Sequence, residues 1–193
     1  MRRRMLIGLT GPARSGKDTV GLHLSGIHNF HLLSFAGPLK DMLRIGLNLN
    51  MEQTDGNRKE EPIDWLDGIT PRSLMQTLGT EWGRQQHPDL WIRIAEQRIV
   101  RFGSETDIVF TDVRFDNEAN MIRRHGGNIF HISRSQVEFI SGIEGHASEA
   151  GVQFNTGVCQ DFSLPNNHTF ESLYDQVEAV INGIRSSTLE EVS

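Results

Sequence analysis

A glycine-rich segment near the start of the chain has the residue types and the spacing that hold nucleotide phosphates. Residues 11–17 read Gly-Pro-Ala-Arg-Ser-Gly-Lys and match the pattern G-x-x-x-x-G-K. The glycines let backbone N–H groups curl around phosphate oxygens, a following helix N-terminus adds partial positive charge, and Lys17 can reach the β- and γ-phosphates. The alternative, a plain glycine-rich turn, does not explain why strand, loop, lysine and helix occur in register. The residues predicted to bind the phosphates of ATP are Gly11, Ala13, Arg14, Ser15, Gly16, Lys17, Asp18 and Thr19.

The position after the lysine departs from the usual pattern. Ser or Thr normally stands there and holds magnesium, whereas this chain has Asp18 followed by Thr19. A carboxylate is also a hard oxygen ligand suited to Mg²⁺. The sequence leaves three possibilities open: Asp18 binds the metal directly, binds it through water, or leaves that role to Thr19.

A loop of this kind needs a strand before it and a helix after it, and the flanking sequence supplies both. Residues 5–10 form a short apolar run typical of a parallel strand that is covered on both faces, and a helix is expected over 17–24. Strands alternate with helices along the rest of the chain. This alternation predicts a three-layer α/β/α sandwich with a central, mostly parallel five-stranded sheet, in which ligands bind at the carboxyl ends of the strands. The further strands are expected at 31–35, 108–111, 128–133 and 159–164, and the further helices at 38–47, from 70, at 88–101, 115–125 and 169–184.

Length and composition fit a single α/β domain. The 193 residues are enough to bury a core, and the 37% hydrophobic and 23% charged residues are typical of a soluble globular protein. We expect one domain over residues 1–185, with a polar, acceptor-side insertion at 48–70 and a glycine-bearing, lid-like segment at 134–151. A flexible tail is expected at 186–193.

Charge and cysteine content exclude several classes of protein. The net charge of −6 argues against direct nucleic-acid binding, so locally concentrated Arg and Lys have to meet any anionic substrate. Cys159 is the only cysteine, which rules out an intrachain disulfide and a zinc site built from cysteines, and fits a reducing cytoplasm. No stretch approaches the ~20 apolar residues that a membrane span needs.

Short segments beyond the phosphate loop separate the possible P-loop classes. No Asn-Lys-x-Asp guanine motif is present, and the chain resembles the bacteriophage deoxynucleoside monophosphate kinases over nearly its whole length. The resemblance implies an adenylate-kinase-like fold with a short lid, in which the γ-phosphoryl group of ATP passes to a deoxynucleoside monophosphate with Mg²⁺, supplying precursors for phage DNA synthesis. The aspartate at position 18 resembles that family's own variant of the loop. The matching segments are 11–19, 36–41, 72–80, 89–91, 112–114, 131–134 and 146–151.

Three charged residues are candidates for the transfer itself, beside Lys17. Asp112 ends a buried strand and can orient hydrated magnesium, or else cap the strand end. Arg114 lies two residues on, where a guanidinium can clamp the acceptor phosphate through two hydrogen bonds. Arg134 closes a strand and opens the lid-like segment, and the resemblance implies that it neutralises charge on the transferring phosphoryl group. The catalytic set is therefore Lys17, Arg114 and Arg134, with Asp18 and Asp112 as candidate Mg²⁺ ligands.

The acceptor site is expected near two helix starts. Lys40 and Arg72 would by default be surface charges, but the resemblance favours phosphate or acceptor contact for Arg72 and leaves Lys40 open between the two readings. Gln76 lies one helical turn after Arg72 and can read a base edge. Trp91 is either core or a stacking plate for the acceptor base. The predicted acceptor-binding residues are thus Lys40, Arg72, Gln76, Trp91, Asp112 and Arg114.

The remaining polar residues carry weaker indications. His146 and Glu149 belong to a matching segment and are assigned to the lid, as structure or as substrate contacts. Asp116 and Glu118 are interpreted as a solvated first helical turn, and residues 166–169 as the loop that packs the adenine. The other histidines lack metal-ligand spacing and are interpreted as structural or surface residues: His23, His28, His31, His87, His125, His131 and His168.

The resulting hypothesis is an ATP-dependent deoxynucleoside monophosphate kinase, acting as a monomer or homodimer. A P-loop kinase for another small acceptor, such as dephospho-coenzyme A, is the first alternative. A nucleotide-binding switch or DNA-associated ATPase is the second alternative, and the negative net charge of the chain disfavours it.

Overall fold

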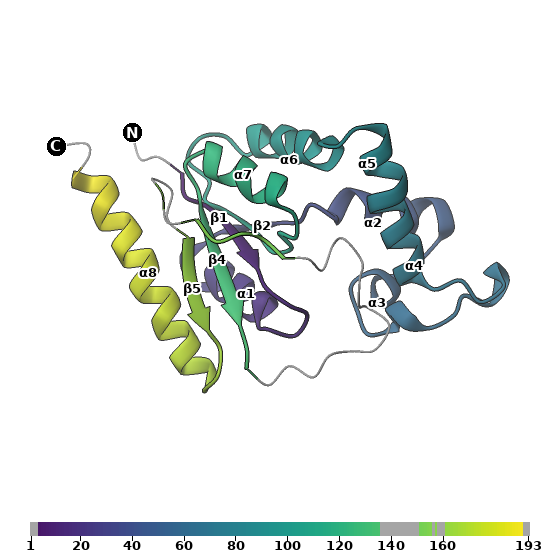
Figure 1. Cartoon of the computed structure of the whole chain (residues 1–193), viewed down its shortest axis with the longest axis horizontal. Coiled ribbons are helices and arrows are strands. Elements are labelled where there is room, and N and C mark those ends of the chain that lie inside the picture. Colours follow the sequence, from purple (N-terminus) through teal and green to yellow (C-terminus); the bar gives the residue numbers. More distant parts are fainter. Residues whose placement is uncertain (1–3, 136–150, 156, 158–160, 191–193) are drawn as a thin grey trace. The chain divides into compact units, whose positions relative to one another are not determined.

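The computed structural model describes residues 4–135, 151–155, 157 and 161–190. A five-stranded sheet lies at its centre, with the strand order β2-β3-β1-β4-β5, and each neighbouring pair of strands is parallel (Figure 1). The predicted α/β class and five-stranded parallel sheet are confirmed. The strands are β1 (Leu6–Thr10), β2 (His31–Leu33), β3 (Ile108–Phe110), β4 (Asn128–Ser133) and β5 (Asp161–Pro165).

The chain divides into two compact units. The first, here called the sheet unit, comprises Met1–Ser34 and Arg98–Ser193, and the second, the helical unit, comprises Phe35–Gln97. The helical unit contains the expected insertion at 48–70. The two units are described separately below.

Both faces of the sheet are covered, which explains why the two central strands β1 and β3 are almost entirely apolar and wholly buried. Helices α1 (Lys17–His28) and α8 (Phe170–Glu190) cover one face, and their apolar side chains share a buried cluster with alternate residues of β1 and β4. Helix α7 (Asp116–Arg124) covers the other face, where Ile122 packs so closely on β1 that a Cβ at Gly8 would lie 2.6 Å from its methyl group. Every residue of β1 is buried, as expected for a central parallel strand.

The helical unit has its own small core. Leu39, Leu43, Leu49, Ile63 and Trp91 are buried together there. The predicted helix start at Thr70 is confirmed, because its side chain accepts a hydrogen bond from the Ser73 N–H. The elements of the helical unit are α2 (Gly37–Leu47), α3 (Met51–Thr54), η1 (Arg58–Glu60), η2 (Asp64–Leu66), α4 (Pro71–Gln76), η3 (Thr77–Trp82), α5 (Gly83–Gln86) and most of α6 (Leu90–Arg101).

The end of the last helix differs from the expectation. A polar tail was expected from Ser186, but α8 continues to Glu190. The hydroxyls of Ser186 and Ser187 donate to the carbonyls of Asn182 and Gly183, four residues back, so polar residues here remain compatible with the helix. Among the described residues, no helix combines the length and the apolar character needed to cross a bilayer.

A buried carboxylate joins the α7 face of the sheet to the segment that precedes β5. The Asp161 side chain is fully buried and accepts hydrogen bonds from Arg123 on α7, from His131 on β4 and from the backbone N–H of Asn155. Burial alone would raise the pKa of Asp161, but these hydrogen bonds outweigh it and hold the pKa below its ordinary value. The ionised carboxylate therefore stabilises the fold.

The Asp161→Asn variant should be less stable and less sensitive to acid. The substitution removes the buried negative charge that Arg123 and His131 contact, and we expect a loss of about 3 kcal/mol in the free energy of unfolding at pH 7. Because the folded-state pKa is lowered, the contribution of Asp161 is complete above its unfolded value of about 4 and is lost as the pH falls through the folded value. Denaturant unfolding between pH 7 and pH 2 measures both effects. Asp175→Asn, which changes an exposed carboxylate on α8, is the control, and an equal effect in both variants would contradict the assignment.

Candidate active site

The phosphate loop links the end of β1 to the start of α1, as predicted. Gly11 has φ +140° and Gly16 has φ +113°, which L side chains rarely adopt. A Cβ at Gly11 would also lie 2.0 Å from the carbonyl oxygen of Ile132 on β4. Both glycines of the pattern are therefore required by the backbone conformation, and Gly11 is required by packing as well.

Lys17 is folded back onto the loop. Its ammonium donates hydrogen bonds of 2.7 Å to the carbonyl oxygens of Gly11 and Pro12. Lys17 is also the first residue of α1, so the first backbone N–H groups of that helix point towards the same region. The arrangement gathers positive charge and N–H donors around one loop, which is what a polyphosphate requires.

Ser15 provides a direct test of whether the loop fits an anionic ligand. It is fully buried, and its Oγ is the only buried side-chain polar atom without a hydrogen-bond partner in the described part of the chain. A Cβ built on Gly11 would lie 3.0 Å from this Oγ, so the hydroxyl lies beside the first glycine of the loop. Such an atom is costly to leave unpaired, and a phosphate oxygen inside the loop would satisfy it.

Asn166 holds the phosphate loop in place from the end of the edge strand β5. It follows β5, is buried, and its Nδ2 donates a 2.8 Å hydrogen bond to the carbonyl oxygen of Ser15. A Cβ at Gly16 would lie 2.6 Å from the same Nδ2, so Gly16 leaves the space that Asn166 fills. The first residue of the loop at 166–169 thus contacts the phosphate loop, and packing of the adenine by this loop stays a prediction. Sequence reasoning missed this contact, since the two residues are 151 positions apart.

Asp112 lies where a magnesium-orienting carboxylate is expected. It follows β3, the strand beside β1, and its Oδ2 accepts a 2.8 Å hydrogen bond from the hydroxyl of Ser34. Val113 donates to the carbonyl of Leu9, which places this segment at the carboxyl end of β1. Asp18 and Thr19 lie in the first turn of α1, and Asp18 is exposed. Carboxylate and hydroxyl oxygens are ligand types that Mg²⁺ prefers, so Asp18, Thr19 and Asp112 stay candidate ligands.

The two arginines of the catalytic set lie in the sheet unit. Arg114 is exposed just before α7, and its backbone N–H donates to Glu118. Glu118 also accepts a hydrogen bond from the Phe115 N–H and is buried, so the prediction of a solvated Glu118 was wrong. Its carboxylate pairs with backbone N–H groups at the start of α7 that have no partner within the helix. Arg134 is exposed directly after β4. His146 and Glu149 lie outside the described residues.

The remaining acceptor candidates belong to the helical unit. Lys40 forms a 2.7 Å ion pair with Asp55, Arg72 pairs with Glu60, and Gln76 is half-buried at the end of α4. Trp91 is 4% exposed, and its indole N–H donates to the carbonyl of Gly79 at 2.7 Å. Of the two roles left open for Trp91, the structure therefore supports core packing over base stacking.

The phosphate loop after the first strand, the carboxylate after the neighbouring strand and the parallel sheet define a P-loop kinase fold. The family model described as deoxynucleotide monophosphate kinase matches residues 57–177. A protein of Acanthamoeba polyphaga mimivirus that provisionally carries this name is 32% identical over 195 residues, covering 92% of this chain and 96% of that protein. This chain belongs to the deoxynucleotide monophosphate kinase family.

Two further comparisons concern the family and the fold. The deoxynucleoside-5′-monophosphate kinase of Escherichia phage T5 is 35% identical over 99 residues, which cover 51% of this chain and 37% of that protein. A crystal structure from Chloroflexus aurantiacus, provisionally described as a kinase, aligns with a TM-score of 0.52 and 11% identity over 92% of this chain and 98% of that one. The structural likeness supports the fold alone.

The Asn166→Ala variant should weaken nucleotide binding and leave the fold intact. Losing the hydrogen bond to Ser15 frees the phosphate loop, and a cost of about 1.4 kcal/mol corresponds to about tenfold weaker ATP binding. Isothermal titration with ATP measures the change. Asn182→Ala is the matched control, since Asn182 is an exposed asparagine on α8 outside the predicted ATP site. Equal affinities in the two variants would rule out the positioning role of Asn166.

Proposed function

We propose that this chain transfers the γ-phosphoryl group of ATP to a deoxynucleoside 5′-monophosphate, giving ADP and a deoxynucleoside diphosphate. The observation that carries the proposal is the phosphate loop, in which the Lys17 ammonium bonds to two loop carbonyls and the buried Ser15 hydroxyl, beside Gly11, has no hydrogen-bond partner among the described residues. Membership of the deoxynucleotide monophosphate kinase family supports the choice of acceptor.

Positioning and charge neutralisation supply most of the rate in such a reaction. The acceptor phosphate is already a competent nucleophile, so no general base is assigned. Lys17 would exchange its two carbonyl partners for β- and γ-phosphate oxygens, while the Ser15 hydroxyl and the first N–H groups of α1 hold the rest of the triphosphate.

Two arginines share the remaining charge in this proposal. Arg114 would bind the acceptor phosphate through two parallel hydrogen bonds, and Arg134 would bind the transferring group. Asp18, Thr19 and Asp112 would hold Mg²⁺, which when bound neutralises charge on the β- and γ-phosphates.

The helical unit offers the residues for recognising the acceptor nucleotide. Arg72 and Gln76 lie one turn apart at the start and end of α4, and Lys40 lies on α2. Lys40 and Arg72 are already paired with carboxylates of the same unit, so an acceptor phosphate would have to replace Asp55 or Glu60.

Substituting Lys17 tests the donor half of the proposal. The Lys17→Ala variant should lose at least about a hundredfold in turnover, because a preorganised positive charge at the transferring group is removed. Its far-UV circular dichroism should be unchanged. Lys59→Ala, a lysine of η1 outside the proposed site, is the control. Near-normal turnover of Lys17→Ala would refute the assignment.

A coupled assay of ADP release tests the acceptor half. We expect release only when a deoxynucleotide such as dTMP, dGMP, dCMP or dAMP is present, and the ribonucleotides measure sugar selectivity. Release with dephospho-coenzyme A alone would instead indicate a kinase for another small acceptor. Release without any acceptor would indicate an ATPase or switch.

A further inference from the structure

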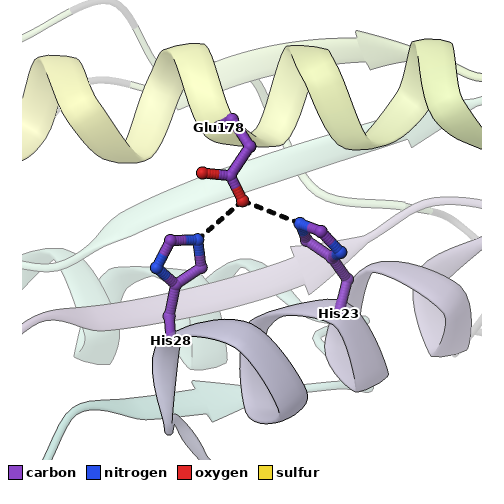
Figure 2. Close-up of side chains that lie close together, drawn as sticks. All are labelled: His23, His28 and Glu178. Atoms are coloured by element: carbon purple, nitrogen blue, oxygen red, sulfur yellow. Dashed lines mark hydrogen bonds and ion pairs between the residues drawn. The ribbon is translucent and has the colours of Figure 1, made fainter.

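Two histidines and a glutamate converge on one point of the sheet unit, away from the phosphate loop. His23 and His28 come from α1 and Glu178 from α8 (Figure 2). The Nε2 atoms of the two rings lie 2.8 and 2.7 Å from the same oxygen, Oε1 of Glu178. One nitrogen or oxygen atom of each residue lies within 4.8 Å of those of the other two.

The surroundings hold the three side chains in place. The two imidazoles are largely shielded from solvent, with side-chain exposures of 13% for His23 and 8% for His28, while Glu178 is 35% exposed. The His23 ring stacks on Tyr174 of α8, with centroids 4.2 Å apart and planes at 9°. Stacking therefore holds the orientation of the His23 ring, His28 is the more deeply buried of the two rings, and Glu178 is the most exposed of the three side chains.

The cluster is separate from the proposed reaction. At 1.5 Å per residue, His23 lies about 9 Å and His28 about 16 Å along α1 from Lys17. The group brings together two imidazole nitrogens and one carboxylate oxygen.

We propose that His23, His28 and Glu178 bind Zn²⁺. Two imidazole nitrogens and one carboxylate oxygen match the donor types that zinc prefers, and water would complete a tetrahedral site. Each imidazole would bind through Nε2 and carry its proton on Nδ1, so the ion takes the place of the two Nε2–H protons that now bridge to Glu178. Mg²⁺ is a poor fit, since it prefers oxygen ligands.

The ion would tie together the two helices that frame the donor site. Helix α1 begins at Lys17 of the phosphate loop, and α8 begins shortly after Asn166, which holds that loop. His28 and Glu178 are 150 residues apart in sequence, so a metal bridge between them closes a long loop of chain. The expected consequence is a more stable sheet unit.

The test is zinc titration of the untagged chain after treatment with a chelator. We expect one tightly bound Zn²⁺ per chain by elemental analysis, and a rise of about 5 °C in Tm at saturating Zn²⁺. The rise should vanish in Glu178→Gln and in the double variant His23→Gln, His28→Gln, and should persist in His125→Ala, which removes an exposed histidine elsewhere. Each shift is measured against the same variant in chelator, so a change in basal stability does not obscure it. The zinc-dependent rise should also persist in Asp18→Asn, which changes a carboxylate beside the phosphate loop.

Three outcomes would overturn the proposal. No zinc-dependent rise in the unmodified chain would leave the cluster as a hydrogen-bonded group only. An undiminished rise in Glu178→Gln and in the double histidine variant would place the ion elsewhere. A rise lost in Asp18→Asn but kept in the histidine variant would assign zinc to the phosphate loop.

Discussion

The close approach of Gly11 to the carbonyl of Ile132 is the constraint on which the donor site depends. Strands β1 and β4 stay paired up to Thr10 and His131, and the chain can leave the sheet there because residue 11 has no side chain. Strand β5 pairs with β4 and delivers Asn166, which bonds to the loop. The phosphate loop is therefore held by the neighbouring strands and their loops as well as by its own turn.

The sequence was sufficient to predict the local parts of this arrangement. The glycine pattern at 11–17, the apolar strand before it and the capped helix start at Thr70 each depend on a few adjacent residues, and the structure has all three. The parallel five-stranded sheet also followed from the alternation of apolar runs and helical segments. Each of these signals depends on residues that are close together in the chain, so a single sequence is enough to recognise it.

Contacts between distant residues could not be predicted in this way. The bonds from Asn166 to Ser15 and from Ser34 to Asp112 join residues 151 and 78 positions apart, and no spacing rule links them. The histidines illustrate the same limit: His23 and His28 lack metal-ligand spacing by themselves, and Glu178 arrives from α8 only through tertiary packing. The burial of Glu118 could not be predicted either, because an acidic residue in a first helical turn normally faces solvent. Here its carboxylate accepts hydrogen bonds from the backbone N–H groups of Arg114 and Phe115.

The ion pairs of the helical unit do not argue against a role in binding an anion. The pairs formed by Lys40 and Arg72 are partly exposed to solvent, and such pairs are worth about 0–1 kcal/mol. A hydrogen bond to a charged group contributes about 1.5–3 kcal/mol, and a guanidinium can make two to one phosphate. A carboxylate held this weakly can be replaced by a phosphate at low cost, more readily at Arg72, whose planar fork can make two hydrogen bonds to one phosphate, than at Lys40, which offers a point charge. The carboxylates would keep these cations in place within an acidic chain until an anionic substrate displaces them.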